Sequence, residues 1–329
     1  MKSRPGGGGT PQKTHPGGRG LPGGKEFALQ LAGPPYFSAV TVLEVIQRSA
    51  EFLARKDVET PRLQVELLLA HVLRLPRMGL YLNFSRELTP PELDQVRELV
   101  RRRGTREPLQ VIVGSTSFCG YEMMVNGRVL VPRPETELLA ECGWTHLNQS
   151  GLAAPAVLDF GTGSGCLAIT LALKCSAARV TALDISPEAL AVARQNCARH
   201  GVAERVQFHE GDGFAALPPG AEFDLLVANP PYIPTAEIAT LEPEVREHDP
   251  RLALDGGADG LDFYRRLAAE AGAYLRPGSL ALCEFGDGQG PAVSAIFATQ
   301  MWIVERVQAD YSGRDRFVVL RRGAGPRVA

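Results

Sequence analysis

Residues 157–165 read Val-Leu-Asp-Phe-Gly-Thr-Gly-Ser-Gly, an apolar run followed by a glycine at every second position. The run predicts a buried parallel strand, and residues 166–174 predict the helix that follows it. Glycines let a backbone pass close to a ligand, and a helix N-terminus offers free N–H groups and partial positive charge. The loop between strand and helix is therefore a candidate ligand site. Its residues are Gly161, Thr162, Gly163, Ser164 and Gly165.

Strands and helices alternate from this unit to the C-terminal part of the chain. The predicted strands are residues 156–159, 180–183, 206–209, 223–228, 280–285, 302–307 and 316–320. The predicted helices are residues 166–174, 187–200, 261–274 and 291–300. This alternation predicts a mostly parallel sheet with right-handed crossovers and with helices on both faces. We assign the α/β domain to residues 135–322.

The N-terminal part of the chain has a different composition and pattern. Residues 1–37 are rich in glycine and proline, which predicts a disordered tail, and they lack the apolar core of a secretory signal. Apolar residues at helical spacing predict a small helical bundle at residues 38–107. At the other end of the chain, residues 323–329 predict a flexible C-terminus.

The pattern between the bundle and the α/β domain is that of short strands and turns. Residues 108–134 predict a β-hairpin linker with extended runs at 111–113, 121–125 and 129–131. Asn126-Gly127 stands between two of these runs, and Asn-Gly is a strong hairpin signal.

The composition limits the classes of function. At 329 residues, with 44% apolar and 22% charged residues, the chain has room for about two domains and a buried core. Its net charge of −2 argues against wholesale binding to nucleic acid. Six scattered cysteines without a CxxC pair suggest neither a metal site nor a disulfide framework, and they favour a reducing compartment. Because no apolar run is long enough to cross a bilayer, we expect a cytoplasmic protein.

Two further strand ends carry residues that suit a nucleoside. Asp184 ends the second strand, where a carboxylate can accept both hydroxyls of a ribose, and Asp212 and Gly213 follow the third strand and could border an adenine. A dinucleotide site is one alternative, although the spacing is GxGxG rather than GxGxxG, and a tight turn without a ligand is another. A ribose, an adenine and a carboxylate without phosphate describe S-adenosylmethionine as well as any nucleotide.

The fourth strand ends in Asn229, Pro230, Pro231 and Tyr232, and the prolines must break the strand there. Together the motifs resemble those of class I methyltransferases that modify an exocyclic or amide nitrogen, and this favours S-adenosylmethionine as the cofactor. Such a nitrogen is a poor nucleophile because its lone pair is delocalised. A site can hold it by accepting its N–H groups, here at the Asn229 side-chain oxygen and the Pro230 carbonyl, while Tyr232 packs against the planar group. No general base has to act before methyl transfer, because the proton can leave afterwards.

A narrower resemblance rests on segments spread over about residues 41–320. They are residues 106–110 (Arg-Glu-Pro-Leu-Gln), 131–137 (Val-Pro-Arg-Pro-Glu-Thr-Glu), the glycine loop, Asn-Pro-Pro-Tyr, 242–243, 253–254, 256–257, 260–261 and 284–286. They resemble the protein-(glutamine-N5) methyltransferases of peptide chain release factors, the HemK or PrmC family. The resemblance implies a Rossmann-like class I methyltransferase domain with an N-terminal helical bundle.

The same resemblance implies a substrate and a set of site residues. The substrate would be the glutamine of the Gly-Gly-Gln motif of class 1 release factors, with the bundle helping to dock the release factor. Residues 161–165, Asp184, Asp212 and Gly213 would hold the cofactor, with Asn229 next to it, and residues 229–232 would hold the glutamine. Two positions depart from the family: Gly213 stands where many relatives carry a tryptophan beside the adenine, and Val111 replaces a usual tyrosine.

Two other functions remain open from the sequence. An adenine-N6 methyltransferase of DNA or RNA shares Asn-Pro-Pro-Tyr, but it needs a basic, aromatic-bearing surface, and only the arginines around Arg101 suggest one. A non-catalytic module that binds release factors or RNA would not need the glycines, Asp184 and Asn229 together.

Overall fold

The structure is a computed structural model that describes residues 40–323, which form two compact units divided between Arg101 and Arg102. The predicted disordered tail at residues 1–37 and residues 324–329 of the predicted flexible C-terminus lie outside the described residues. No helix in the described part of the chain is both long and apolar enough to span a membrane.

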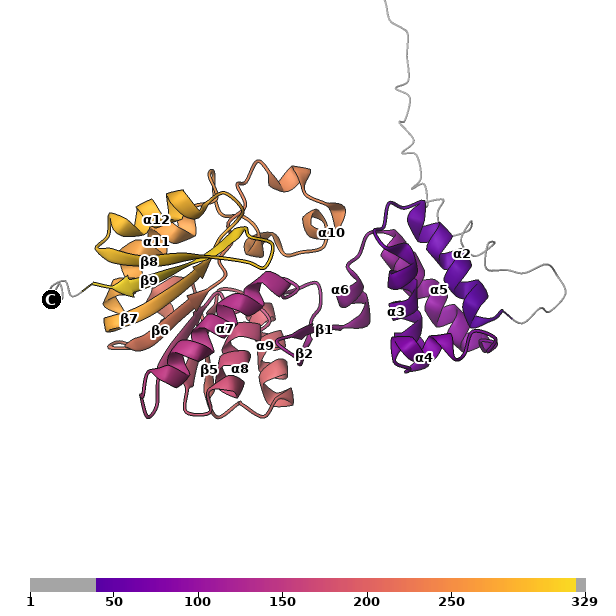
Figure 1. The fold of residues 1–329 in the computed structure, drawn as a ribbon, viewed down its shortest axis with the longest axis horizontal. Helices are drawn as coiled ribbons and strands as arrows, with labels where there is room; N and C mark the ends of the chain where they lie inside the picture. The colour runs from indigo at the N-terminus through magenta and orange to yellow at the C-terminus, as the bar shows by residue number, and fades with distance from the viewer. Residues whose placement is uncertain (1–39, 324–329) are drawn as a thin grey trace, which may run out of the picture. The chain divides into compact units, whose positions relative to one another are not determined.

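The first unit is a helical bundle, as predicted (Figure 1). Its apolar stripes pack together, and side chains such as Val45, Leu68 and Val96 are completely buried. A capping box starts the first helix, because Thr41 Oγ1 accepts the Glu44 N–H at 3.3 Å and Glu44 Oε2 accepts the Thr41 N–H at 2.8 Å. The helices are α2 (Val42–Ala54), α3 (Pro61–Leu73), α4 (Arg77–Tyr81) and α5 (Pro90–Gly104), the last of which continues into the second unit.

The segment after α5 differs from the prediction. Residues 111–113 are helical, within α6 (Leu109–Val113), because Pro108 starts this short helix and Gly114 ends it in the left-handed region at φ 85°. The hairpin pairs β1 (Ser115–Phe118) with β2 (Tyr121–Met124).

The turn of this hairpin is Cys119-Gly120 and not Asn126-Gly127. Cys119 and Gly120 both have positive φ, which a type I′ turn requires. Asn126 instead accepts the Arg128 N–H at 2.9 Å, which makes a local turn in the loop before the next helix, and residues 129–131 are not a strand.

The second unit contains a seven-stranded sheet in the order β5-β4-β3-β6-β7-β9-β8. The first five strands in this order are parallel, and β9 and β8 are antiparallel to their neighbours. The strands are β3 (Ala156–Phe160), β4 (Arg179–Asp184), β5 (Val206–Glu210), β6 (Phe223–Ala228), β7 (Leu275–Glu284), β8 (Trp302–Ala309) and β9 (Asp315–Arg322). The prediction of a mostly parallel sheet is confirmed.

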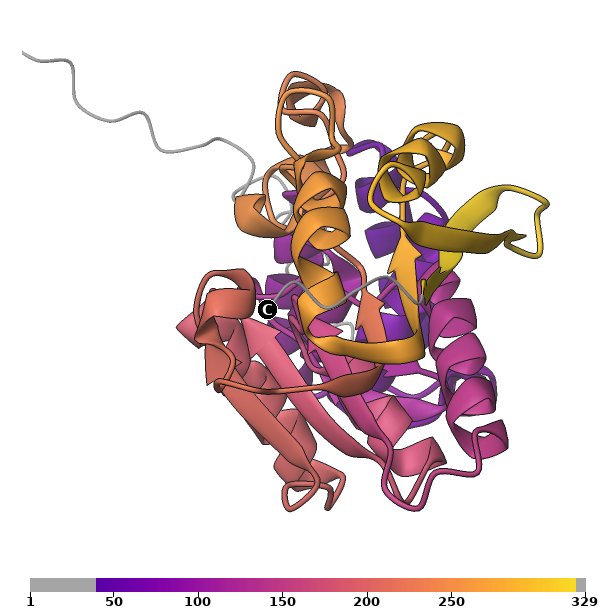
Figure 2. The same ribbon diagram turned by 90° about the vertical axis from the view of Figure 1, so that its left-hand side faces the viewer.

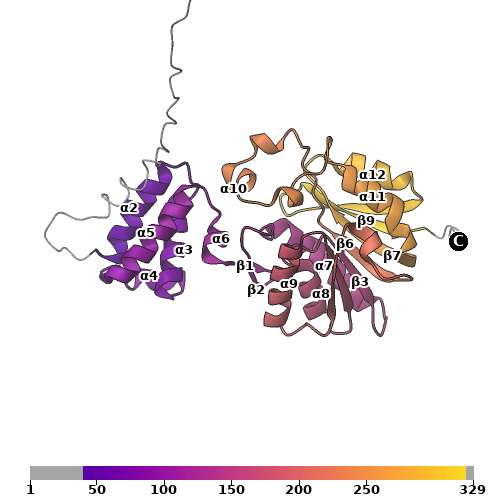
Figure 3. The same ribbon diagram turned by 180° about the vertical axis from the view of Figure 1, so that it is seen from behind.

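Helices cover both faces of the sheet (Figures 2 and 3). Alternate residues of the strands supply two apolar cores: Val157 and Leu225 pack with α7 and α8, whereas Leu158 and Leu226 pack with α11 and α12. Besides α6, the helices of this unit are α7 (Pro134–Gln149), α8 (Cys166–Lys174), α9 (Pro187–Arg199), α10 (Pro243–Arg246), α11 (Asp262–Glu270) and α12 (Gly290–Ala298). The short 3-10 helices are η1 (Gly213–Ala216), η2 (Ile238–Thr240), η3 (Arg251–Ala253) and η4 (Ala271–Ala273).

From β3 the chain first builds β4 and β5 on one side of this strand, and it then crosses to build β6 on the other side. The order of the strands therefore reverses at β3. In an open parallel sheet, ligands bind at the carboxyl ends of the strands next to such a reversal. The glycine loop follows β3 and residues 229–232 follow β6, so both predicted motifs stand at this edge of the sheet.

Candidate functional site

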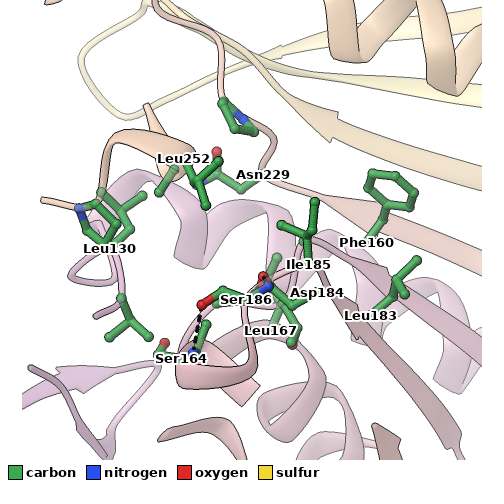
Figure 4. A pocket seen from close by; sticks show the side chains of 18 of the residues that line it. Leu130, Phe160, Ser164, Leu167, Leu183, Asp184, Ile185, Ser186, Asn229 and Leu252 are labelled. Atoms are coloured by element: carbon green, nitrogen blue, oxygen red, sulfur yellow. Dashed lines mark hydrogen bonds between the residues drawn. The ribbon is translucent and has the colours of Figure 1, made fainter. Parts of the chain in front are cut away.

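A cavity of the second unit opens at this edge of the sheet and contains most of the predicted site residues (Figure 4). Those that line it are Gly161, Thr162, Gly163, Ser164, Asp184, Asp212, Gly213, Asn229 and Pro231. Gly165, Pro230 and Tyr232 are not among the lining residues. The cofactor motif and the Asn-Pro-Pro-Tyr motif therefore meet in one space.

The glycine loop turns sharply from β3 into α8. The N–H groups of Gly161 and Thr162 both donate to the Leu183 carbonyl, at 2.8 and 2.9 Å, which ties the loop to the end of β4. Gly161 and Gly163 have φ of 75° and 55°, and a Cβ on either would meet no atom within 4 Å. These glycines are thus required by the backbone conformation, and the space beside them is open to a ligand.

The Asp159 side chain holds the glycine loop in place through hydrogen bonds. No role was predicted for Asp159 from the sequence. It is completely buried, and its Oδ2 accepts Thr162 Oγ1 at 2.6 Å and the Ala168 N–H at 3.0 Å. Burial raises the pKa of Asp159 to about 7. Its position in the strand just before the glycines is the only sequence signal for this role.

This raised pKa predicts a pH-dependent stability. Between about pH 4 and pH 7 the folded protein keeps a proton on Asp159 that the unfolded chain has lost, so stability falls as the pH rises. The slope from this group is about 1.4 kcal/mol per pH unit, and Asp159→Asn should remove it. Trp144 and Trp302, the two tryptophans of the chain, lie in the second unit, so their fluorescence in urea reports its unfolding. An identical pH dependence of the free energy of unfolding in wild type and variant would contradict this assignment.

Asp184 stands at the end of β4 with both carboxylate oxygens oriented by the backbone. Oδ2 accepts the Gly163 N–H at 2.8 Å and Oδ1 accepts the Ser186 N–H at 2.9 Å. Burial raises its pKa, and these backbone N–H groups oppose that shift. Each oxygen accepts one of these bonds and keeps a further lone pair, so the carboxylate can still bind hydroxyl groups in the cavity.

Arg266 fills the space left by the absence of a side chain at Gly213. Its guanidinium donates to the Asp212 carbonyl at 2.8 Å and forms an ion pair with the Asp212 carboxylate. A Cβ on residue 213 would lie 2.3 Å from Nη2 of Arg266. Because Arg266 also lines the cavity, a planar cation stands here beside Gly213.

Close backbone packing holds the Asn-Pro-Pro-Tyr segment in place. A Cβ on Gly260 would lie 2.2 Å from the Tyr232 carbonyl oxygen, and one on Gly256 would lie 2.8 Å from that of Pro231. Gln289 Nε2 also donates to the Tyr232 carbonyl at 2.9 Å. These contacts explain why glycines occupy positions 256 and 260.

Tyr232 packs away from the cavity, among the residues of one apolar core. A Cβ on Gly286 would lie 3.0 Å from its ring, and burial raises the pKa of Tyr232 to about 12. The phenol therefore stays neutral at physiological pH. Its predicted packing against a substrate amide remains a prediction.

Asn229 is half-buried at the end of β6, and its side chain is held by a residue of α7. Asn229 Nδ2 donates to Thr136 Oγ1 at 3.1 Å, and Thr136 lines the same cavity. Thr136 belongs to the Pro-Arg-Pro-Glu-Thr-Glu segment, to which the sequence gave no part in the site. Among the described residues, no group of three or more His, Cys, Asp or Glu side chains is placed to hold a metal ion.

Protein-family models match both the N-terminal helical part of the chain and the α/β domain that follows it. The model of the PrmC N-terminal domain matches residues 44–114, and that of the methyltransferase small domain matches residues 136–245. A release factor glutamine methyltransferase from Geobacter sulfurreducens is 46% identical over 283 residues, which cover 86% of this chain and 97% of the relative. One from Chlorobaculum tepidum is 45% identical over 282 residues, covering 84% of this chain and 95% of the relative.

A solved structure is also similar. It is a release factor-specific protein-(glutamine-N5) methyltransferase from Alicyclobacillus acidocaldarius, 31% identical, with a TM-score of 0.37. The match covers 59% of this chain and 94% of that one.

Proposed function

Because the chain belongs to the family of release factor glutamine methyltransferases, we propose that it methylates the side-chain amide nitrogen (N5) of the glutamine in the Gly-Gly-Gln motif of class 1 peptide chain release factors. It is an S-adenosylmethionine-dependent class I methyltransferase with a Rossmann-like sheet. The observation that supports the substrate assignment best is the shared cavity, which Asn229 lines together with the glycine loop and Asp184 of the cofactor site.

The residues of the cavity fit S-adenosylmethionine. Gly161 and Gly163 leave open space where other residues would carry a side chain, and Asp184 presents an oriented carboxylate suited to ribose hydroxyls. Asp212, Gly213 and Arg266 would border the adenine. The bound cofactor supplies an electrophilic methyl group on a sulfonium.

The protein's own contribution to the reaction is to hold and orient the substrate amide. Asn229 Nδ2 is engaged by Thr136, which leaves Oδ1 to accept an N–H of the glutamine amide. We assign the second N–H to the Pro230 carbonyl, although Pro230 is not among the residues that line the cavity. Holding both N–H groups keeps the nitrogen in line with the methyl group, so proximity and orientation lower the barrier. The proton leaves after the transfer.

Incubation with labelled S-adenosylmethionine and separate release factor, DNA and RNA substrates tests the proposal. We expect label in the release factor and none in either nucleic acid. Label in DNA or RNA alone would replace the proposal with an adenine-N6 methyltransferase, and cofactor binding without transfer to any substrate would favour a binding module. We place the reaction in the cytoplasm.

We further propose that the domains act as predicted: residues 38–107 as a substrate-docking domain, 108–134 as a linker and 135–322 as the methyltransferase domain. The four helices of the first unit belong to a compact unit of their own, and the cofactor cavity is lined entirely by residues of the second unit. Docking and chemistry are therefore separable.

Removal of residues 1–101 should spare cofactor binding. This cut keeps Arg103 and Arg106, whose guanidiniums pair with Glu244 at 2.7 and 2.6 Å inside the second unit. We expect S-adenosylmethionine affinity to stay within about threefold, while methylation of an intact release factor falls at least about tenfold more than that of a short Gly-Gly-Gln peptide. Calorimetry and a methylation assay measure the two effects. Equal losses on protein and peptide would reject the docking role.

A further inference from the structure

We propose that Thr136 and Glu284 are positioning residues that fix the direction of the Asn229 amide, so that its oxygen rather than its nitrogen faces the substrate. This inference rests on the proposed function, because it assigns Asn229 the task of accepting an N–H group. The three residues come from three segments that are distant in the sequence: the start of α7, the end of β6 and the end of β7.

One hydrogen bond and one close polar contact connect these side chains. Asn229 Nδ2 donates to Thr136 Oγ1 at 3.1 Å, and the Thr136 hydroxyl lies close enough to the Glu284 carboxyl to lower the pKa of that carboxyl as a hydrogen-bond donor. Thr136 is 2% exposed and Glu284 is 4% exposed, so water does not compete for these contacts. Tyr264 Oη donates to the Glu284 carbonyl at 2.7 Å, which fixes the backbone of Glu284.

The number of hydrogens on each group decides which of Asn229, Thr136 and Glu284 donates and which accepts. A threonine hydroxyl has a single hydrogen, and an ionised carboxylate can only accept. When Thr136 gives its hydrogen to Glu284, it can offer Asn229 only a lone pair, so the amide must turn its NH₂ group toward Thr136. The carbonyl oxygen of the Asn229 side chain is then left for the cavity. A flipped amide would set its NH₂ group against the substrate N–H, donor against donor.

This role also accounts for a buried acid that the mechanism otherwise leaves without a function. Burial of a carboxyl is costly, and Glu284 Oε2 has no hydrogen-bond partner among the described residues. Burial raises the pKa of Glu284 to about 7, Glu135 raises it further, and Thr136, Arg316 and Arg133 oppose the shift. At about pH 8.5 the carboxylate is therefore ionised and acts only as an acceptor.

Substitution of Thr136 separates the hydroxyl from the shape of the side chain. At about pH 8.5, Thr136→Val should lower the single-turnover methylation rate about 10- to 100-fold, because the Asn229 amide loses its fixed direction. Cofactor affinity should stay within about threefold, since the cofactor residues are untouched. Thr136→Ser keeps the hydroxyl and should restore most of the rate. Glu284→Gln, whose amide can donate to Thr136 and free its hydrogen, should lower the rate at least several-fold.

A matched control comes from the same unit. Thr170 is also completely buried, and its Oγ1 has no hydrogen-bond partner among the described residues, so Thr170→Val should leave the rate unchanged. Rates are compared with wild type on whichever substrate the wild type methylates, so a failure of the release factor assignment does not affect this test. A wild-type rate for Thr136→Val or Glu284→Gln, or a Thr136→Ser variant as slow as Thr136→Val, would overturn the proposal.

Discussion

Replacement of Asn229 by alanine is expected to lower the rate of release factor methylation by about 10² or more, the scale for loss of one preorganised polar contact. The Asn229 side chain lies at the end of β6 in the shared cavity, and its Nδ2 is already held by Thr136. The variant therefore loses the oxygen that holds the substrate amide. The cofactor residues come from the glycine loop and Asp184, so S-adenosylmethionine affinity should stay within a few-fold. Single-turnover rates and calorimetry measure the two quantities.

Asn229→Asp serves as the companion variant and separates geometry from charge. A carboxylate still accepts a hydrogen bond, but it adds negative charge near the sulfonium and favours the charged reactant over the transition state in which that charge is neutralised. It also cannot donate to Thr136. We expect a loss comparable to that of Asn229→Ala. A near-wild-type rate for Asn229→Ala, with the fold confirmed by circular dichroism, would falsify the amide-clamp mechanism.

Asp184→Ala is expected to weaken S-adenosylmethionine binding by about 1.5–3 kcal/mol, or about 10- to 150-fold, as is typical of hydrogen bonds to a charged group. The carboxylate is the group best placed for the ribose hydroxyls, since Gly163 and Ser186 fix both of its oxygens. Calorimetry measures the affinity.

Loss of Asp184 also frees two backbone N–H groups, so a control for loop geometry is needed. Asp184→Asn keeps one accepting oxygen and should retain part of the affinity. Unchanged affinity in a folded Asp184→Ala variant would remove Asp184 from the cofactor site.

The sheet and its helices could be predicted because residues next to each element, such as glycines and prolines, determine where that element begins or ends. Helix α8 and strand β6 have the predicted bounds, residues 166–174 and 223–228, since glycines precede one and prolines follow the other. Residues 111–113 were predicted as extended because they are apolar and β-branched, yet they form part of a five-residue helix. Pro108 and Gly114 decide that helix through their backbone angles, which outweigh the weak preference of the side chains.

The candidate site could be predicted only in part. The glycine loop, Asp184 and Asn229 follow strands directly, so the order of the sheet brings them together. Thr136 lies 93 positions before Asn229, and no local pattern connects the two. Arg266 could not be placed beside Gly213 for the same reason, because its position depends on how α11 packs on the sheet.

The central claim is that the acceptor of the methyl group is one glutamine amide. Tandem mass spectrometry of a release factor incubated with the enzyme and S-adenosylmethionine tests it most directly. We predict the added mass of one methylene on the glutamine of the Gly-Gly-Gln motif, and about 10² less of this modification with Asn229→Ala after the same short incubation. A methyl group on another residue of the release factor, or an unmodified release factor beside methylated DNA or RNA, would contradict the claim.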